Sequence, residues 1–452
     1  MKIVIVGCGK IGTTLIGNLV KEGHDVVAID KSADTIADVI NIYDVIGVCG
    51  IGTDVEVLQE AGAGECDLFV AVTGSDEMNM LGCYMAKTLG AENTIARIRD
   101  RAYNDKNLGF LQNQLGLTMS INPERFTAYD IYHVLKLPSA MHIETFSARN
   151  FEMIEIMLKP DSPLAGTKIM DLRKLYHANF LVCAVGRGDE VVIPDGNFEL
   201  KGEDKLALCA APNEIIKLLR SLKVTRKQAK SVMILGASRT AYYLAKMLLA
   251  TGSSVTIIDK DADRCKEIAD ALPTANVILG DGAQQDLLIE EGLRDVDAFV
   301  ALTNIDEENI LISYFAQSQG VNKVITKVNR KEFVPMAAKL GLDTIVSPKR
   351  TIARVVVRYA RAMQNSVGSK VEKLYRIMED NAEALQFDVS ADFKHVNIPL
   401  KNIKFKKNVL IAGILRNRKG IVPTGDDVIM PGDKVIVIST GQILCDLADI
   451  IA

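Results

Sequence analysis

MKIVIVGCGKIGTTLIGNLV, residues 1–20, joins a short apolar run to a glycine pattern and then to an amphipathic segment. The glycines of the pattern Gly-x-Gly-x-x-Gly are Gly7, Gly9 and Gly12, and a second apolar run ends at Asp30. Strand, glycine turn, helix, second strand and terminal acid follow one another here in the order of a dinucleotide-binding βαβ unit. The opening of the chain therefore predicts a Rossmann-like domain.

Each of these positions has a physical role in such a unit. Gly7 allows the tight turn, Gly9 lets the backbone approach a pyrophosphate, and Gly12 lets the helix pack closely on the strand. The helix N-terminus offers N–H groups and a positive dipole end to the phosphates. The Asp30 carboxylate is placed to accept hydrogen bonds from the adenosine ribose and would repel a 2′-phosphate, which favours NAD over NADP. A glycine turn with a purely structural role is the alternative.

The chain is a tandem duplication. CDLFVAVTGSDEMNM (66–80) recurs as VDAFVALTNIDEENI (296–310), and DVVAIDK (25–31) recurs as SVTIIDK (254–260). Further on, VVIPDGNFELKGEDKLAL (191–208) resembles GIVPTGDDVIMPGDKVIV (420–437). Each half thus consists of a long part and a short part in the same order, as expected for a repeated unit.

The long part alternates apolar strands with amphipathic helices, which indicates a doubly wound parallel sheet. The short part reads as a small α+β lobe. The predicted fold class is therefore α/β, with two Rossmann-like parallel-sheet domains that are each followed by such a lobe. In the first copy we expect strands at 3–6, 26–29, 45–48, 68–72, 95–98 and 119–121, and helices at 13–22, 55–61, 77–89, 104–115 and 124–137.

The second copy should repeat this pattern from 232 to about 347, with a further helix near 349–364. In the lobes we expect strands at 153–158, 180–185, 190–193 and 205–210 with a helix at 213–222, and strands at 385–389, 409–415, 420–422 and 434–439 with a helix at 441–450. We expect the first parallel-sheet domain at 1–138 and its lobe at 139–222, followed by a polar linker at 223–230. The second parallel-sheet domain is expected at 231–364 and its lobe at 365–452.

The second glycine turn departs from the first. SVMILGASRTAYYLAKMLL (231–249) keeps Gly236, places Ser238 and Ala241 at the other two glycine positions, and Asp259 ends its second strand. Ala241 is compatible with close packing, but Ser238 adds a Cβ where the backbone should approach a phosphate, and Arg239 could contribute charge instead. A Rossmann scaffold with a weakened or altered site is the alternative to a second intact site.

Further candidates follow later strands. Thr73 ends the fourth strand, where ligands bind in parallel sheets, although Asp76 and Glu77 behind it could simply favour the start of the next helix. Arg97 in the fifth strand, with Lys327 as its counterpart, could reach phosphates or pair with a carboxylate. Asp281 in the second copy could face the adenosine. The first copy has Ile51 at the equivalent position, and nothing in the sequence explains this difference.

Composition narrows the function classes. The 452 residues carry a net charge of −4, which argues against nucleic acid as the main partner. The apolar runs are too short to span a bilayer, and the eight cysteines and five histidines show no metal-ligand spacing, so we expect a cytoplasmic protein without a metal. No proton donor or acceptor set accompanies the glycine pattern, which disfavours an NAD-dependent oxidoreductase, the alternative function.

The segments IVIVGCGKIGTTL…VVAID, FVAVTGSDEMN, IARIRD and LGLTMSINPE, followed by the VVIP…LKGEDKLAL lobe, resemble the RCK (also called KTN) family. A tandem pair on one chain resembles the regulatory subunits of Trk-type potassium-uptake systems. The resemblance implies binding of NAD(H) or of ATP/ADP without catalysis. It also implies a homotetrameric ring that docks on a membrane-embedded Trk-type potassium-translocating subunit at the cytoplasmic face of the inner membrane.

Carried over position by position, the family's nucleotide site falls on residues of both copies. The first copy departs from the family at Gly50-Ile51, where Gly-Asp is usual. The second departs at Ser238 and Ala241. The positions are Gly7, Cys8, Gly9, Lys10, Ile11, Gly12, Asp30, Lys31, Thr53, Thr73 and Arg97 in the first copy, and Gly236, Ser238, Arg239, Asp259, Asp281 and Thr303 in the second.

Overall fold

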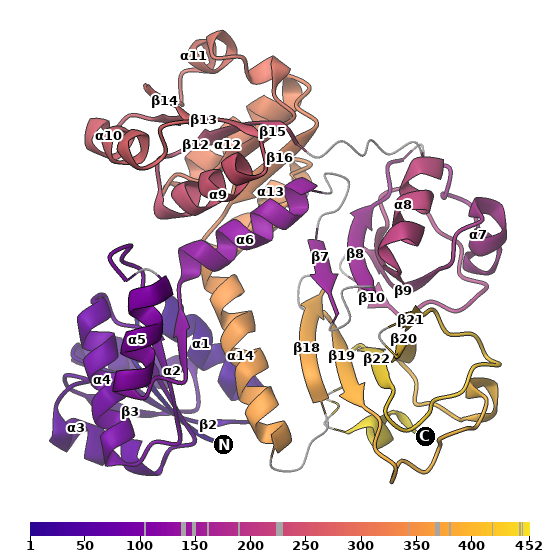
Figure 1. Ribbon diagram of the computed structural model, residues 1–452, viewed down its shortest axis with the longest axis horizontal. Helices are drawn as coiled ribbons and strands as arrows, with labels where there is room; N and C mark the ends of the chain where they lie inside the picture. The colour runs from indigo at the N-terminus through magenta and orange to yellow at the C-terminus, as the bar shows by residue number, and fades with distance from the viewer. Residues whose placement is uncertain are drawn as a thin grey trace. The chain divides into compact units, whose positions relative to one another are not determined.

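The chain divides into two units, residues 1–128 with 347–360 and residues 129–346 with 361–452. Most of the linker expected at 223–230 lies outside the described residues. None of the described helices is long and apolar enough to cross a membrane. The computed structural model (Figure 1) describes residues 1–103, 105–136, 142–146, 151–160, 162–188, 190–222, 229–342, 344–366, 371–378, 381–417, 419–442, 444 and 446–452.

A six-stranded sheet in the order β3-β2-β1-β4-β5-β6 forms the centre of the first unit. Its neighbouring strands are all parallel, so their carboxyl ends lie at one edge. The strand order reverses between β1 and β4, and such a switch point is where open parallel sheets bind ligands. The strands are β1 Lys2–Val6, β2 Asp25–Asp30, β3 Ile46–Cys49, β4 Leu68–Ala71, β5 Asn93–Arg97 and β6 Met119–Ile121.

Helices connect these strands, and one of them, α2, was missed in the sequence prediction. The Ser32 hydroxyl caps α2 by accepting a hydrogen bond from the backbone N–H of Thr35 (3.2 Å), and Ile36 is buried against the sheet. Ile40 and Ile42 are exposed on the same helix, which obscures its amphipathic pattern. The connecting helices are α1 Lys10–Lys21, α2 Ala33–Ile42, α3 Val55–Glu60, η1 Ala63–Glu65, α4 Asp76–Leu89 and α5 Asp105–Leu115.

The second sheet repeats the first in the order β14-β13-β12-β15-β16-β17, again with parallel neighbours. The predicted repetition of the long part is confirmed. Its elements are β12 Ser231–Leu235, α9 Arg239–Ala250, β13 Ser254–Asp259, α10 Ala262–Ala271, β14 Asn276–Leu279, α11 Gln285–Glu290, η2 Leu293–Asp295, β15 Ala298–Ala301, α12 Asp306–Ser318, β16 Lys323–Lys327, η3 Lys331–Phe333, α13 Val334–Lys339 and β17 Ile345–Val346.

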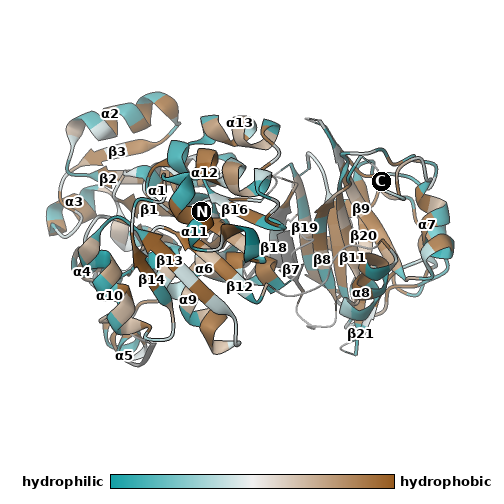
Figure 2. Cartoon of the chain, turned by 90° about the horizontal axis from the view of Figure 1, so that it is seen from above, coloured by the Kyte–Doolittle hydropathy of each residue, from teal (hydrophilic) through white to brown (hydrophobic). Residues whose placement is uncertain are grey.

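The central strands are apolar on both faces because helices cover both sides of a doubly wound sheet. Ile3, Val4 and Ile5 of β1 are fully buried, as are Met233 and Ile234 of β12. Figure 2 shows strands coloured mostly as apolar beside helices that alternate between apolar and polar residues. The continuous apolar runs of the sequence therefore correspond to the buried strands.

A long helix follows each sheet, α6 Pro123–Lys136 after the first and α14 Pro348–Ser366 after the second. Residues 347–360, most of α14, belong to the first unit although they follow the second sheet in the sequence. The Tyr359 hydroxyl donates a hydrogen bond to Oδ1 of Asn93 at the start of β5 (3.1 Å). A helix that lies more than two hundred residues further along the sequence thus packs with the first sheet.

The two short parts fold into five-stranded antiparallel sheets in the orders β10-β9-β11-β8-β7 and β18-β19-β22-β20-β21. Phe146 and Phe151 of the first lobe share one apolar core with Tyr375 and Ile438 of the second. Their elements are β7 His142–Thr145, β8 Glu152–Met157, α7 Ile169–Tyr176, β9 Phe180–Arg187, β10 Glu190–Val192, β11 Lys205–Ala210, α8 Pro212–Ser221, β18 Val371–Ile377, β19 Ala382–Asp388, η4 Leu400–Asn402, β20 Val409–Arg416, β21 Lys419–Ile421, β22 Lys434–Ser439 and η5 Leu447–Ile450.

The lobes differ from the sequence prediction at several points. Strands β7 and β18 and helix α7 were not predicted. The helix predicted at 441–450 is wrong, because the described residues there form only the single turn η5. Gly441 adopts a left-handed backbone conformation (φ +68°), and Asp446 caps a turn only further along, by accepting the N–H of Ala448 (2.9 Å). The first copy instead has Pro212, whose fixed φ suits the first turn of α8.

A buried carboxylate pairs with an arginine in each lobe. Oδ1 and Oδ2 of Asp204 accept hydrogen bonds from Nε and Nη2 of Arg187 (both 2.7 Å), and Asp433 accepts the equivalent pair from Arg416. Burial alone would raise the pKa of the Asp204 carboxyl, but hydrogen bonds from Arg187 and from the Lys201 N–H outweigh it and lower the pKa. The ionised carboxylate therefore stabilises the fold.

We expect Asp204→Asn to lower the free energy of unfolding by about 1–3 kcal/mol at pH 7. Because the folded pKa is depressed, this contribution is present above the ordinary pKa of 3.8 and is lost as the pH falls through the lower folded pKa. Urea unfolding at a series of pH values should thus show the variant and the parent converging in acid. Asp392→Asn, at an exposed aspartate, is the control. A deficit that does not change with pH would contradict this account.

Candidate functional site

The first glycine turn connects β1 to α1 at the carboxyl edge of the first sheet. Gly7 has φ +95°, and a Cβ there would lie 2.9 Å from backbone atoms of Thr73, at the end of β4. A Cβ on Gly12 would lie 1.9 Å from the carbonyl oxygen of Gly7. A Cβ on Gly9, by contrast, would meet no atom of the described chain within 4 Å. Packing within the chain therefore explains two of the three glycines and leaves Gly9 unexplained.

The N-terminus of α1 lies beside this exposed glycine. Gly9 is the N-cap residue and has no side chain that could accept a hydrogen bond from the first turn. The first N–H groups of a helix have no partner within the helix. The first turn consists of Lys10, Ile11 and Gly12, without an acidic residue, and Lys10 is exposed. The helix end is therefore suited to an anion.

Asp30 ties the end of β2 to the glycine turn. Its Oδ2 accepts a hydrogen bond from the backbone N–H of Cys8 (2.7 Å), and its Oδ1 accepts one from Ser32 (3.0 Å). A carboxylate has about four acceptor positions, so two bonds leave capacity for ribose hydroxyls. Burial, and secondly the charge of Asp30, raise the pKa of the Cys8 thiol to about 12, so this thiol stays protonated. Lys31 follows Asp30 and is exposed.

Thr73 is held by a buried asparagine that sequence reasoning did not place in the site. Oδ1 of Asn79 accepts hydrogen bonds from the backbone N–H (2.8 Å) and the hydroxyl (2.7 Å) of Thr73. The Asn79 amide donates to the carbonyl oxygen of Arg97 (2.9 Å). Thr303 and Asn309 repeat this arrangement in the second copy. The recurrence of the asparagine in both copies was the available signal.

Asp76 links two loops at the same edge of the sheet. Its Oδ2 accepts the backbone N–H groups of Arg99 and Asp100 (both 2.7 Å), while Ser75 caps α4 by accepting the N–H of Met78. Asp76 is buried, and Asp306 accepts the N–H groups of the equivalent residues in the second copy. Asp76 therefore fastens the segment after β5 to the start of α4, in addition to any effect on the helix dipole.

The cations of the fifth strands are engaged with the loop after the fourth strand. Nη2 of Arg97 donates a hydrogen bond to the carbonyl oxygen of Thr73, and the arginine is buried. Nζ of Lys327 lies 3.4 Å from the carbonyl oxygen of Leu302 and from Oδ1 of Asn304. Both cations therefore support this loop.

Thr53 lies in the turn between β3 and α3, which packs against the end of β1. A Cβ on the adjacent Gly52 would lie 2.1 Å from Cγ1 of Val6, and one on Gly282 in the second copy would lie 2.0 Å from Cδ1 of Leu235. The turns after β1, β3 and β4 therefore meet at the switch point of the first sheet, and the turns after β12, β14 and β15 meet at that of the second. The candidate residues from Gly7 to Thr73 come together at this edge in the first copy.

The second glycine turn has the same backbone and a different helix start. Gly236 has φ +100°, and Asp259 accepts the backbone N–H groups of Ala237 (2.5 Å) and Asp261 (2.9 Å). The Ser238 hydroxyl, however, accepts a hydrogen bond from the N–H of Ala241 (3.3 Å) and so caps α9. The serine thus occupies a helix N–H donor that glycine leaves available in the first copy.

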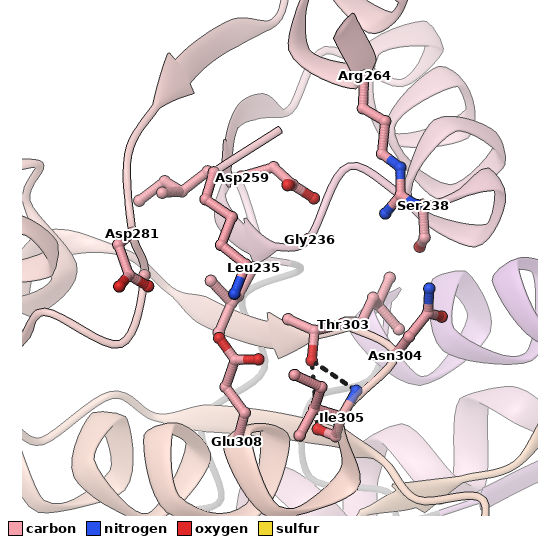
Figure 3. A pocket seen from close by; sticks show the side chains of 14 residues that line it. Leu235, Gly236, Ser238, Asp259, Arg264, Asp281, Thr303, Asn304, Ile305 and Glu308 are labelled. Atoms are coloured by element: carbon pink, nitrogen blue, oxygen red, sulfur yellow. Dashed lines mark hydrogen bonds between the residues drawn. The ribbon is translucent and has the colours of Figure 1, made fainter. Parts of the chain in front are cut away.

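A pocket of about 210 Å³ opens at this edge of the second sheet. Figure 3 shows Asp259, Asp281, Thr303 and Ser238 around it. Arg239 begins α9 but is not among the described lining residues, and sequence reasoning had not singled out Lys260, Arg264, Asn304 or Glu308. The lining consists of Leu235, Gly236, Ser238, Ile258, Asp259, Lys260, Arg264, Asp281, Gly282, Leu302, Thr303, Asn304, Ile305 and Glu308.

The described residues contain no group of three or more His, Cys, Asp or Glu side chains suited to a metal ion. Both edges offer hydrogen-bond donors and acceptors from backbone and side chains, arranged around a helix start and a strand-terminal acid. Such an arrangement is suited to a polar ligand that is held by positioning and charge.

Comparison with known proteins places the chain in a family. The TrkA-N domain matches residues 3–123 and 232–348, and the TrkA-C domain matches 153–223 and 385–452. The Trk system potassium uptake protein TrkA homolog 1 of Methanosarcina mazei is 31% identical over 97% of both chains. The Trk system potassium uptake protein TrkA of Vibrio alginolyticus is 31% identical over 97% of this chain and 95% of its own.

The fold also has a solved counterpart. The GsuK channel bound to NAD aligns with a TM-score of 0.61 and 17% identity over 97% of this chain and 77% of that chain. The relatives are named after a potassium-uptake system, in keeping with the prediction that the protein is not an enzyme. With both pairs of domains matched in order over nearly its full length, the chain belongs to the TrkA family of Trk potassium-uptake proteins.

Proposed function

We propose that this protein is the nucleotide-sensing regulatory subunit of a Trk-type potassium-uptake system. It binds NAD(H), or ATP and ADP, and gates a membrane-embedded potassium-translocating subunit. In this proposal the chains form a homo-oligomeric ring of four that is held through the partner at the cytoplasmic face of the inner membrane.

The observation that carries the proposal is the combination of Gly9, the start of α1 and Asp30. Gly9 is the one glycine of the first turn that packing within the chain does not require. It lies beside a helix N-terminus suited to phosphate, and Asp30 next to it retains acceptor capacity for a ribose. A dinucleotide explains all three features together.

Regulation requires that the ligand bind one conformation of the ring more tightly than another. The glycine turn is fastened to β2 through Asp30 and to β4 through the close approach of Gly7 to Thr73. A ligand bound across these loops would contact three strand ends at once. Differential binding there supplies a route by which nucleotide occupancy changes the shape of the domain and thus transport.

Gly9→Ala should weaken nucleotide binding at the first site about tenfold or more and leave stability unchanged. The added methyl meets no described atom of the chain, but it stands where the backbone would approach the pyrophosphate. Calorimetric titration with NADH, NAD⁺, ATP and ADP measures the affinity, and thermal unfolding measures the stability. Gly109→Ala within α5, where a Cβ likewise meets nothing within 4 Å, is the control for affinity. Unaltered affinity for every nucleotide would contradict a role of Gly9 in binding.

The transport role is tested with the Trk-type membrane subunit reconstituted in liposomes. Potassium flux should depend on this protein and on the nucleotide, and Gly9→Ala should shift the nucleotide concentration at half-maximal flux. If the potassium flux were the same with and without this protein, the regulatory role would be overturned even if the protein still bound nucleotide.

A further inference from the structure

The first sheet ends at a strand edge that carries exposed apolar side chains. Among the described strands, β3 pairs with β2 alone and lies at the edge of the sheet. Ile46 at its start is 67% exposed, and Ile40 and Ile42 on α2 are 45% and 66% exposed. Figure 2 shows α2 next to β3, with the strand coloured mostly as apolar. We call Ile40, Ile42 and Ile46 the α2–β3 patch, and exposed apolar side chains that gather in this way are typical of an interaction surface.

The α2–β3 patch lies on both faces of the edge strand. A Cβ on Gly47 would lie 2.6 Å from Cδ1 of Ile40, so Ile40 covers β3 on the face that α2 packs against. Ile46 precedes Gly47, and successive side chains of a strand point to opposite faces. Tyr43 holds the connection between helix and strand, because its ring lies 2.7 Å from the position of a Cβ on Gly17 of α1. An extended segment along β3 would therefore meet Ile40 on one face and Ile46 on the other with alternate side chains.

The second copy has the same edge without the patch. Helix α10 and strand β14 align with α2 and β3, and Ala269, Ala271 and Asn276 occupy the three positions. All three are exposed, so the scaffold does not need a large apolar side chain at any of them. Packing within the fold therefore does not account for the isoleucines, whereas a partner that contacts the first copy alone would.

The surroundings of the α2–β3 patch are acidic. Residues 32–60 contain six acidic side chains, all exposed, and no Lys or Arg. The net charge of the whole chain is −4, so this stretch carries more negative charge than the chain as a whole. The aligned residues 261–290 of the second copy include Arg264 and Lys266. A partner that complements the first edge is thus cationic. The acids are Asp34, Asp38, Asp44, Asp54, Glu56 and Glu60.

We propose that the α2–β3 patch binds an extended cationic segment with apolar side chains, a cytoplasmic loop of the membrane-embedded potassium-translocating subunit. This inference rests on the proposed function and names the surface through which the partner is held. The cytoplasmic loops of membrane proteins carry an excess of Lys and Arg. Such a segment adds to the edge of β3, packs its apolar side chains on the isoleucines and places its cations among the acids.

The test measures binding of the full chain to the purified Trk-type membrane subunit in lipid nanodiscs by biolayer interferometry. Ile40→Ala, Ile42→Ala and Ile46→Asn together transfer the residues of the second copy to the first, and should weaken docking about tenfold or more. Nucleotide affinity and the unfolding midpoint should stay at the parental values, because the three side chains are exposed. Leu175→Ala on α7, where the leucine is 59% exposed, is the control and should leave docking unchanged.

The acidic surroundings have a readout of their own. Docking of the parent should weaken as the salt concentration rises, because salt screens charges at a surface. Asp38→Lys with Asp44→Lys should weaken docking at low salt and flatten this dependence. Asp270→Lys with Asp392→Lys makes the same change of net charge at exposed positions elsewhere and should have neither effect. If the isoleucine variant has a lowered unfolding midpoint, the comparison of these two lysine pairs decides the question.

The outcomes separate this inference from the proposed function. Parental docking by the isoleucine variant would overturn the inference alone, as would equal losses of docking in the two lysine pairs. A changed oligomeric state of the isoleucine variant in analytical ultracentrifugation, with docking retained, would assign the patch to contacts between copies and overturn it as well. If the parent does not bind the membrane subunit at all, the proposed function fails and this inference fails with it.

Discussion

Gly12→Ala is expected to abolish nucleotide binding at the first copy and to destabilise its domain by about 1–3 kcal/mol, the usual cost of overpacking. The new methyl would lie 1.9 Å from the carbonyl oxygen of Gly7, a backbone atom that cannot move without displacing the turn. That turn also packs on Thr73 and donates the Cys8 N–H to Asp30, so its displacement would disturb three strand ends. Thermal unfolding and calorimetric titration with NADH measure the two effects.

The duplication supplies the matched control. Ala241 occupies the equivalent position in the second copy and is fully buried, so that turn accommodates the methyl group. Ala241→Gly should leave the first site unaffected. Gly9→Ala should reduce affinity with no change in the unfolding midpoint, whereas Gly12→Ala changes both. A Gly12→Ala chain with the parental midpoint and parental affinity would show that the turn is not close-packed in solution.

Asp30→Ala is expected to weaken nucleotide binding by about 1.5–3 kcal/mol, or roughly 10- to 100-fold, the range for hydrogen bonds to a charged group. The carboxylate is the acceptor both for the turn, through Cys8, and for the start of α2, through Ser32. Its removal takes away the expected ribose contact and loosens the glycine turn at the same time. Titration with NAD⁺ and NADH measures the affinity.

Two further variants separate these roles. Asp30→Asn retains one oxygen acceptor, so its affinity should lie between those of Asp30→Ala and the parent. Asp259→Ala removes the equivalent carboxylate from the second copy, where it accepts the N–H groups of Ala237 and Asp261. This change should spare dinucleotide binding at the first copy. Unchanged NAD(H) affinity in Asp30→Ala would mean that the ligand is not held at the first glycine turn.

Local patterns predicted the elements that carry a strong repeat of apolar residues. Ile3 to Val6 is continuously apolar because β1 is buried on both faces, and strands at 119–121 and 205–210 were placed at their observed bounds. Helix α2 was missed because exposed isoleucines mask its polar face. The helix at 441–450 was wrong because Gly441 takes a left-handed conformation that apolar spacing does not reveal.

The candidate site was predictable where it depends on backbone chemistry. Gly7, Gly12 and Asp30 were assigned roles from their spacing alone, and the structure gives them contacts consistent with a tight, close-packed turn. The hydrogen bonds of Asn79 to Thr73 were not foreseen, because they join residues through side-chain orientation. Whether these residues hold a nucleotide stays a prediction.

The sequence by itself determined the α/β class, the duplication and the order of the domains, because these follow from short-range periodicity and from similarity between distant segments. Only the tertiary structure decided that most of α14 packs with the first sheet, where the Tyr359 hydroxyl donates a hydrogen bond to Asn93. It alone placed Arg264 and Asp281 at one pocket while Ser238 caps a helix. Side-chain direction and long-range packing depend on which strand ends meet, and no local window of residues contains that information.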